Sequence, residues 1–172
     1  HTEARSHGFP ETCILPGHIV GPGWVPLNPQ ANFNPEVYAQ LARGETVSMP
    51  DLGQALVHHV HADDVAQMFV RALTHWNAAV GESFHAVSPA ALTLRGYAEA
   101  VAAWFGKSAA LDLMPFDQWK AAVSSKDADA TWGHLEHSPN CYSIAKAQHS
   151  LEYQPRYTSL QAIYESVQWL IA

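Results

Sequence analysis

Residues 58–66, HHVHADDVA, mark the place where a strand passes into a helix. The strand is predicted from Ala55 to His61. Asp63 or Asp64 can then cap the helix. The helix carries apolar side chains at helical spacing, namely Val65, Met68, Phe69, Ala72, Leu73 and Trp76. A strand followed directly by an amphipathic helix is typical of α/β proteins.

Short strands and helices alternate on both sides of this unit. Further strands are predicted at Thr12–Leu15, Thr46–Met49, Ser83–Val87 and Leu111–Leu113. Helices are predicted to begin near Asn34, Thr93, Asp117, Ser143 and Thr158, each of which can act as a cap. Residues 21–34 read as a long loop, and residues 124–142 as irregular. The alternation predicts an α/β fold, although the strands are too few for a complete doubly wound sheet.

Composition narrows the class of protein. The chain has 172 residues, enough for one domain with a core, and a formal net charge of −7, which disfavours a nucleic-acid-binding face. No apolar run approaches the roughly 18 residues that a membrane span requires. Cys13 and Cys141 are too few for a disulfide framework, so a reducing cytoplasm is expected. The 11 histidines make metal binding a hypothesis to weigh.

The histidines are densest in the strand that precedes the helix. In an extended strand His59, His61 and Asp63 share one face, because side chains alternate with a period of two. His-x-His-x-Asp begins the zinc site of metallo-β-lactamase-like hydrolases, and imidazole and carboxylate ligands suit zinc. His134 and His137 can supply distant ligands. One position of that motif fails here, and the alternative is a strand end whose acids cap the next helix.

Two other segments partly match dehydrogenase motifs but lack the neighbouring sequence elements that those motifs require. Tyr142-x-x-x-Lys146 matches the acid-base pair of short-chain dehydrogenases. It follows no Gly-rich dinucleotide loop, since residues 21–23 lack the third glycine and the strand–helix setting. We therefore interpret Tyr142 and Lys146 as the start of a surface helix. Residues 16–23 are a strand end and glycine loop, in which His18 can contact a substrate or the loop can be a structural turn.

Five segments resemble, in the same order, the second half of extended short-chain dehydrogenases/reductases, the NAD-dependent epimerase/dehydratase family. They are residues 16–23 (PGHIVGPG), 32–35 (NFNP), 60–66 (VHADDVA), 81–85 (GESFH) and 143–155 (SIAKAQHSLEYQP). The resemblance extends over nearly the whole chain. Leu15 departs from it, because many members have Arg or His there, and Glu152 replaces a usual glycine.

The resemblance implies an NAD(P)-dependent enzyme that oxidises a hydroxyl group of a sugar-nucleotide-like substrate by hydride transfer. The residues implied to lie beside the nicotinamide are Pro16, Gly17, His18 and Ile19. The residues implied to contact the substrate are His18, Asn32, Phe33 and His61. The family's Gly-rich loop, catalytic Ser/Thr and Tyr-x-x-x-Lys pair belong to an N-terminal half that precedes these segments. No catalytic residue is therefore expected in this chain, which begins at His1 and reads as a fragment or processed form.

The implied fold is the C-terminal portion of a doubly wound NAD(P)-binding fold with a small α/β substrate-binding subdomain. Residues 1–30 and 54–88 would supply late strands and a helix of the cofactor-domain sheet, 31–53 a substrate loop and helix, and 89–172 a mainly helical substrate-side subdomain. Open strand edges would make the isolated chain associate with the missing half or with itself. Neither nucleic acid nor membrane is expected as a partner. Two alternatives remain open: a zinc-dependent hydrolase and a non-catalytic binding module.

Overall fold

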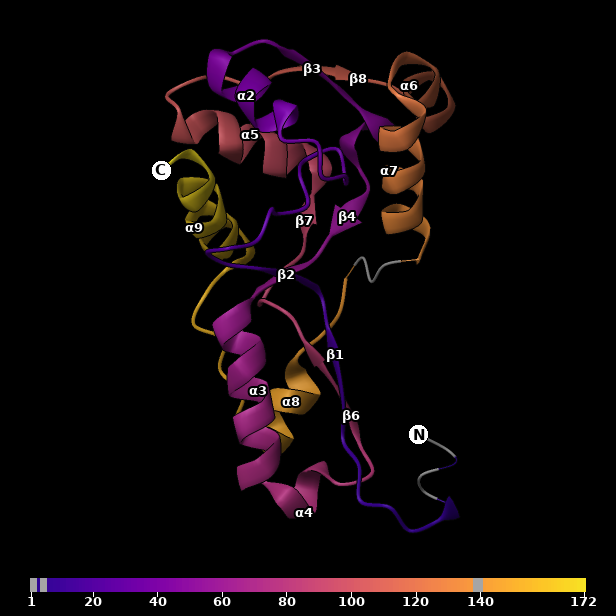
Figure 1. Cartoon of the computed structure of the whole chain (residues 1–172), viewed down its shortest axis with the longest axis vertical. Coiled ribbons are helices and arrows are strands. Elements are labelled where there is room, and N and C mark those ends of the chain that lie inside the picture. The colour runs from indigo at the N-terminus through magenta and orange to yellow at the C-terminus, as the bar shows by residue number, and fades with distance from the viewer. Residues whose placement is uncertain (1–2, 4–5, 138–140) are drawn as a thin grey trace.

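The computed structural model describes residues 3, 6–137 and 141–172. Its elements form two parts along the long axis of the molecule (Figure 1). The lower part holds β1 (Cys13–Pro16), β6 (Ser83–Ala86), α3 (Ala62–Thr74), α4 (Trp76–Ala79) and α8 (Ala145–Leu151). The upper part holds β3 (Thr46–Met49), the 3-10 turn η1 (Pro50–Gly53), β4 (Leu56–Val57), β7 (Leu92–Thr93), β8 (Ala110–Leu113), α2 (Glu36–Arg43), α5 (Leu94–Trp104), α6 (Phe116–Ala122), α7 (Ser125–His137) and α9 (Ser159–Ile171). β2 (His18–Val20) lies where the parts meet and pairs with β5 (His59–His61).

The lower part is a parallel strand pair covered by helices. β1 and β6 run in parallel, with Cys13 opposite Ser83. Val65 of α3 and Leu151 of α8 are buried with Phe84 of β6 in one hydrophobic cluster. The predicted α/β fold with parallel strands is therefore confirmed. The division of the chain at residue 89 stays a prediction, and α8 packs in the lower part although it follows that boundary.

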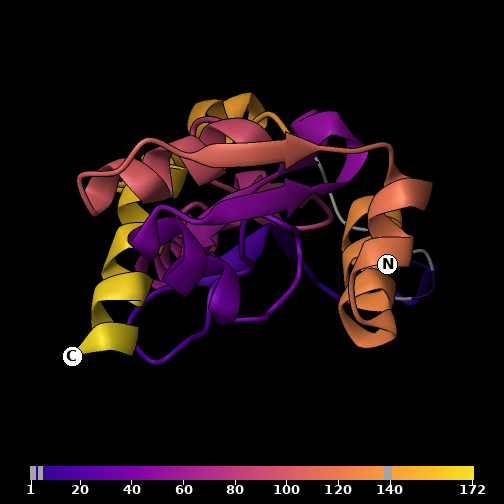
Figure 2. The same ribbon diagram turned by 90° about the horizontal axis from the view of Figure 1, so that it is seen from above.

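The upper part has its own core. β3 and β8 run in parallel and side by side (Figure 2), with α2 and α5 packed nearby. Leu41, Val47, Tyr97 and Ile163 are buried together there. α7 and α9 stand on opposite sides of this part in the same view. None of the described helices combines the length and the apolarity that crossing a bilayer demands.

The predicted strand Ala55–His61 is divided at His58, which corrects the sequence analysis. β4 pairs antiparallel with β7, whereas β5 pairs in parallel with β2. The strand breaks because its two ends join different partners. This change of partner places His59 and His61 beside β2, at the junction of the two parts.

Side-chain caps begin two helices as predicted, with Thr93 capping α5 and Thr158 capping α9. The predicted caps Asn34, Asp117 and Ser143 are wrong, because α2, α6 and α8 have Pro35, Pro115 and Ile144 at the cap position.

The start of α3 differs from the prediction. Its cap is His61, whose Nδ1 accepts a hydrogen bond from the backbone N–H of Asp63 at 3.1 Å. Asp63 and Asp64 lie inside the first turn, where carboxylates interact favourably with the helix dipole.

The prediction that residues 124–142 are irregular is wrong over Ser125–His137, which forms α7. The apolar pattern of this segment is weak, and polar contacts to the loop before α2 hold the helix instead. Thr131 is buried, accepts a hydrogen bond from Asn32 Nδ2 at 3.2 Å and donates one to the carbonyl O of Gln30 at 2.8 Å. Tertiary contacts thus outweigh weak local propensity.

Candidate functional site

Three histidines and a phenylalanine meet where the two parts join. β2 carries His18, and β5 carries His59 opposite it in the strand register, with ring centres 5.6 Å apart. α7 brings the ring centre of His134 to 5.1 Å from that of His18, edge-on. Phe33, in the loop before α2, lies 5.2 Å from His134 between ring centres. We call these four residues the histidine cluster. Phe33 is exposed and His18 and His134 are half-buried, so the cluster is open on that side.

Burial keeps the imidazoles of the cluster uncharged near neutral pH. Desolvation, with smaller effects of nearby His134 and His58, lowers the pKa of His18 to about 4. Desolvation and the neighbouring His18 lower the pKa of His59 to about 3. Burial also lowers the pKa of His134. The cluster therefore presents neutral hydrogen-bonding groups, rather than charges, to a molecule bound beside it.

His59 belongs to a buried polar network. Its Nε2 lies 3.2 Å from the carbonyl O of Leu27, which also accepts a hydrogen bond from the Tyr97 hydroxyl at 2.9 Å. The hydroxyls of Tyr97 and Tyr38 are 2.7 Å apart. Because a carbonyl oxygen only accepts, Nε2 of His59 carries the proton and Nδ1 is left as an acceptor. Within the described part of the chain, that buried Nδ1 has no hydrogen-bond partner. His59 is thus buried and held in place by this hydrogen bond, and His18 and Phe33 supply the surface that a bound molecule can contact.

The lowered pKa values predict a loss of stability in acid. An unfolded histidine titrates near 6.5, so below that pH the unfolded chain binds protons that folded His18 and His59 do not. Their contribution is fully present above pH 6.5 and is lost as the pH falls toward about 4 and about 3. His59→Gln removes one titrating group, so it should make the decline of the unfolding free energy below pH 6.5 shallower in urea titrations. The exposed His149→Gln is the control, and equal slopes in both variants would contradict the prediction.

The residues predicted to lie beside the nicotinamide occupy the end of β1 and the start of β2. Pro16 is exposed, and Ile19 packs against the lower core. Gly17 has no room for a side chain, because an added Cβ would lie 2.3 Å from the backbone O of His58. Of the four residues, His18 alone joins the histidine cluster. Contact with a nicotinamide stays a prediction.

Asn32 and Phe33, both predicted to contact substrate, lie in different surroundings. Asn32 is fully buried, and its Oδ1 accepts hydrogen bonds from Asn28 Nδ2 at 2.6 Å and from the backbone N–H of Asn34 at 3.0 Å. These bonds fix the loop, so Asn32 positions Phe33. Phe33 is 49% exposed, and its ring is the part of the loop that reaches the cluster.

His61, also predicted to contact substrate, forms hydrogen-bond contacts with α3 and α9. Its Nδ1 accepts the hydrogen bond that caps α3, and its Nε2 lies 3.1 Å from Glu165 Oε2 on α9. Its ring stacks on Tyr157 with centres 4.0 Å apart. The side chain is 5% exposed, so its observed contacts are structural. A substrate contact of His61 stays a prediction.

The geometry does not support the zinc alternative. His59 is bonded to a backbone carbonyl, and both ring nitrogens of His61 have partners other than a metal. Among the residues that the structure describes, no group of three or more His, Cys, Asp and Glu side chains is placed to hold a metal ion. The side chain of His137, a candidate distant ligand, lies outside the described residues.

Tyr142 and Lys146 have separate partners, so the structure does not bring them together as an acid-base pair; Lys146 lies in the first turn of α8, and Tyr142 precedes that helix. The Tyr142 ring stacks on His85 with centres 4.0 Å apart. Lys146 Nζ lies 2.8 Å from Glu82 Oε2 and donates to the carbonyl O of Ser83, also at 2.8 Å. The lysine thus anchors α8 to the start of β6.

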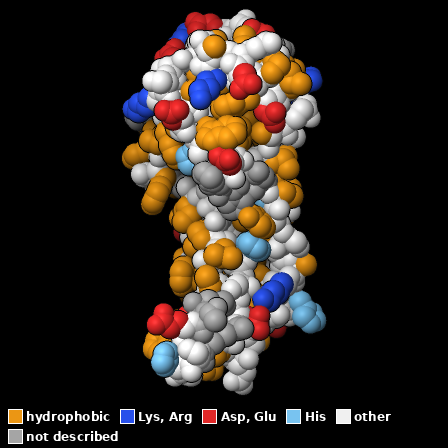
Figure 3. Space-filling view, turned by 90° about the vertical axis from the view of Figure 1, so that its right-hand side faces the viewer, with side chains coloured by type: hydrophobic (Ala, Val, Ile, Leu, Met, Phe, Trp, Pro, Cys, Tyr) orange, Lys and Arg blue, Asp and Glu red, His pale blue; other side chains and the backbone are white. Residues whose placement is uncertain are grey.

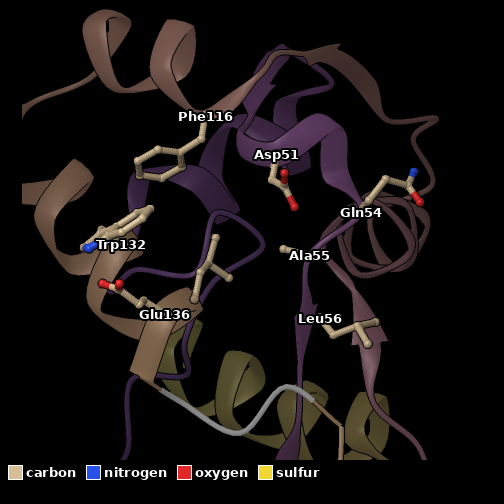
Figure 4. Close-up of a pocket in the computed structure, with 8 residues that line it drawn as sticks. Asp51, Gln54, Ala55, Leu56, Phe116, Trp132 and Glu136 are labelled. Atoms are coloured by element: carbon tan, nitrogen blue, oxygen red, sulfur yellow. The ribbon is translucent and has the colours of Figure 1, made fainter.

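A groove that the sequence analysis missed lies between η1, β4 and α7 (Figure 4). It has a volume of about 410 Å³. Asp51 directs its carboxylate into it, Phe116 and Trp132 line one wall, and Glu136 lies beside Trp132. We call it the acidic groove. Three of its lining residues, Trp132, Leu135 and Glu136, come from the segment predicted to be irregular, so no periodic pattern pointed to it.

Comparison with known proteins identifies a family to which this chain is similar. The model of the NAD dependent epimerase/dehydratase family matches residues 1–86. No curated protein matches the sequence.

Many solved structures share the fold. UDP-glucose 4-epimerase from Thermotoga maritima, solved with UDP-glucose, is 17% identical over 98% of this chain and 48% of its own, with a TM-score of 0.63. The dTDP-glucose 4,6-dehydratase DesIV from Streptomyces venezuelae, with NAD and TYD bound, is 18% identical over 99% and 46%, with a TM-score of 0.64. RMD from Pseudomonas aeruginosa, complexed with NADPH, is 14% identical over 99% and 51%, with a TM-score of 0.62. The chain therefore spans about half the length of the structures that it matches.

Proposed function

The chain belongs to the NAD-dependent epimerase/dehydratase family, and on that premise we propose that it forms the substrate side of an NAD(P)-dependent oxidoreductase. The substrate is a hydroxyl compound, of the sugar-nucleotide type or another, whose hydroxyl carbon is oxidised transiently or outright. The solved relatives that bind UDP-glucose, NAD or NADPH support this class of reaction. A cytoplasmic setting remains part of the proposal.

The histidine cluster is the observation that carries the proposal. His18 follows the carboxyl end of β1, and ligands of open α/β sheets bind at the carboxyl ends of the strands. Its imidazole is neutral near pH 7, so it can donate a hydrogen bond to the substrate and accept one from it. Phe33 offers an apolar surface that excludes water from one side of the bound hydroxyl.

The residues beside His18 fit the ring end of a dinucleotide. Leu15 and Pro16 are exposed at the end of β1, and neither carries a charge. Such an edge suits the uncharged nicotinamide amide rather than a pyrophosphate, which binds to glycine-rich loops and helix N-termini. The cofactor, when bound, supplies the hydride acceptor. The role of this chain is to hold the substrate hydroxyl against that acceptor.

We further propose that polypeptide outside this sequence carries the dinucleotide-binding loop and the catalytic Tyr-x-x-x-Lys pair. The chain spans about half of the solved structures, which supports this division. β1 supports it too, because in the described part of the chain it pairs along one edge only, with β6. A further strand along β1 would extend the parallel sheet, and the isolated chain should associate through this edge.

The proposal predicts the behaviour of a polypeptide that joins this chain to the segment preceding it in its gene. With NAD or NADP, this protein should oxidise at least one member of a panel of alcohols and sugar nucleotides, followed by nicotinamide absorbance. His18→Ala should raise KM for the hydroxyl substrate about tenfold through the loss of a hydrogen bond to that substrate. The exposed His149→Ala serves as the matched control. A protein that binds no dinucleotide and oxidises no panel member would instead favour a non-catalytic binding module.

A further inference from the structure

The ring of His59 has a buried nitrogen that no donor in the described part of the chain satisfies. The side chain is fully buried, and its Nε2 donates to the carbonyl O of Leu27 at 3.2 Å. Nδ1 is therefore an acceptor, and it is shielded from solvent and without a hydrogen-bond partner. Buried polar atoms of native proteins are rarely left in this state, because it is unfavourable. A bound molecule cannot reach a buried atom, so the donor that Nδ1 requires is a neighbouring side chain.

Two aromatic side chains that can donate lie against the His59 ring, those of Tyr97 and His18. The Tyr97 hydroxyl donates to the carbonyl O of Leu27 at 2.9 Å, so its single proton is already used. The His18 ring is neutral, because burial lowers its pKa to about 4, and a neutral imidazole carries one N–H. Of the two, His18 is therefore the available donor.

The backbone holds the two histidines close enough for this hydrogen bond. His18 and His59 are opposite each other in the pairing of β2 with β5, with ring centres 5.6 Å apart and ring planes tilted by 50°. An N–H···N bond of about 2.9 Å between two imidazoles, each with a radius of about 1.1 Å, places the ring centres about 5 Å apart. The torsion that turns a histidine ring is soft, so a small rotation of His18 brings its N–H to Nδ1 of His59.

His134 meets the His18 ring from another side, but it does not require the same proton. The two rings meet edge-on with centres 5.1 Å apart. His134 is half-buried, and neither of its nitrogens is among the described buried atoms that lack a partner. Water can therefore hydrogen-bond to His134, whereas it does not reach Nδ1 of His59. The His18 N–H is thus better placed on His59.

The second nitrogen of His18 is then left for a bound molecule. An imidazole that donates from one nitrogen keeps the other as an acceptor. His18 is half-buried and Phe33 beside the cluster is exposed, so this side is open. Figure 3 shows histidine side chains at the surface among hydrophobic ones, on the side of the molecule where α7 lies. A small molecule can therefore approach the acceptor nitrogen across an apolar surface.

We propose that His59 is a positioning residue: its Nδ1 accepts a hydrogen bond from the His18 ring, which fixes the tautomer of His18 and leaves the other ring nitrogen as an acceptor for the substrate hydroxyl. This inference rests on the proposed function, because it takes the histidine cluster as the substrate site. It narrows the role of His18, which accepts a hydrogen bond from the substrate and does not donate one. His59 acts through His18 and does not touch the substrate.

A fixed tautomer gives the site a preference between the two oxidation states of the substrate. A hydroxyl group donates to an acceptor nitrogen, whereas a carbonyl oxygen only accepts and finds no donor on His18. A site built to hydrogen-bond a hydroxyl discriminates against a molecule that lacks it. The cluster therefore favours the alcohol over the carbonyl compound that its oxidation yields.

NMR spectroscopy of the chain alone, with ¹⁵N-labelled histidine, tests the proposal. Two-bond couplings between the carbon-bound ring protons and the ring nitrogens show which nitrogen of a histidine carries the proton. The signals lost in His18→Gln assign His18. At pH 7 His18 should populate one tautomer over the other by about fivefold or more, as expected for one net hydrogen bond.

Two substitutions separate the nitrogens of His59. Asparagine places an oxygen where Nδ1 lies, and glutamine places an amide N–H where Nε2 lies. His59→Gln should therefore shift the tautomer ratio of His18 by about fivefold, and His59→Asn should restore the wild-type ratio. The exposed His149→Gln is the control and should not change the ratio.

The proposal is overturned if wild-type His18 populates both tautomers to a similar extent, a result that needs no variant to fold. It is also overturned if His59→Gln leaves the ratio as it is, which would assign a buried water rather than His18 to Nδ1. The spectra require neither cofactor nor turnover. Failure here is therefore distinguishable from failure of the proposed function, which depends on dinucleotide binding and oxidation by the joined polypeptide.

Discussion

Gly17→Ala is expected to destabilise the fold by about 3 kcal/mol or to prevent its formation, because overpacking against backbone cannot be relieved by side-chain motion. The added Cβ would lie 2.3 Å from the carbonyl O of His58. Backbone hydrogen bonds hold the segment on both sides: the N–H of Gly17 donates to Ala86 O at 3.1 Å, and that of His18 donates to His58 O at 2.8 Å. Relief of the clash would break at least one of them. The measurement is the midpoint of urea unfolding, followed by far-UV circular dichroism.

Gly133→Ala is the matched control for this substitution. Gly133 lies within α7, and an added Cβ there has no atom within 4 Å. Alanine in a helix interior is favoured over glycine by about 1 kcal/mol, so this variant should be slightly stabilised. If both variants unfold at the same urea concentration, the close approach of Gly17 to the backbone of His58 does not constrain the fold.

Asp64→Asn is expected to destabilise the chain by about 2 kcal/mol, because it removes a buried charged acceptor and leaves one partly buried backbone donor without an acceptor. The carboxylate of Asp64 is fully buried and accepts hydrogen bonds from the backbone N–H groups of Arg156 at 2.8 Å and Tyr157 at 3.2 Å. Asparagine has one oxygen, and its NH₂ group would face the second N–H. The affected segment leads into α9, so the loss should also loosen the Tyr157 ring that stacks on His61.

Asp63→Asn is the adjacent control. The Asp63 side chain is 56% exposed and pairs with the guanidinium of Arg156 at 3.0 Å. Exposed ion pairs of this kind contribute less than about 1 kcal/mol. We therefore expect Asp64→Asn to lower the free energy of unfolding more than Asp63→Asn does. Equal losses would show that the hydrogen bonds of the buried Asp64 carboxylate do not anchor the segment before α9.

The elements with a strong local pattern could be predicted from the sequence. The amphipathic run that starts at Val65 gave the helix α3, and Thr93 and Thr158 marked helix starts that the structure confirms. α7 could not be predicted, because its stability comes from contacts such as that between Thr131 and the distant Asn32 rather than from its own periodicity. The break at His58 was hidden for a similar reason, since it depends on two different partner strands.

The candidate site was only partly predictable. The glycine loop after β1 pointed to His18, but nothing in the sequence indicated that His134, from a segment with no clear pattern, would lie against it. The alternation rule placed His59 and His61 on one face of a strand, which suggested a shared metal. In the structure the two side chains have different neighbours. The His59 ring packs edge-on against Tyr97 in the upper core, and the His61 ring stacks on Tyr157 before α9. Side-chain partners of this kind are set by tertiary packing and not by spacing.

The most direct test of the central claim is a calorimetric titration of NAD and NADP into two proteins, this chain alone and the chain joined to the segment that precedes it in its gene. If this chain is the substrate side of the enzyme, the chain alone binds neither dinucleotide measurably and turns over no alcohol, and the joined protein binds one of them and oxidises a hydroxyl compound. Tight dinucleotide binding and turnover by the chain alone would contradict the account.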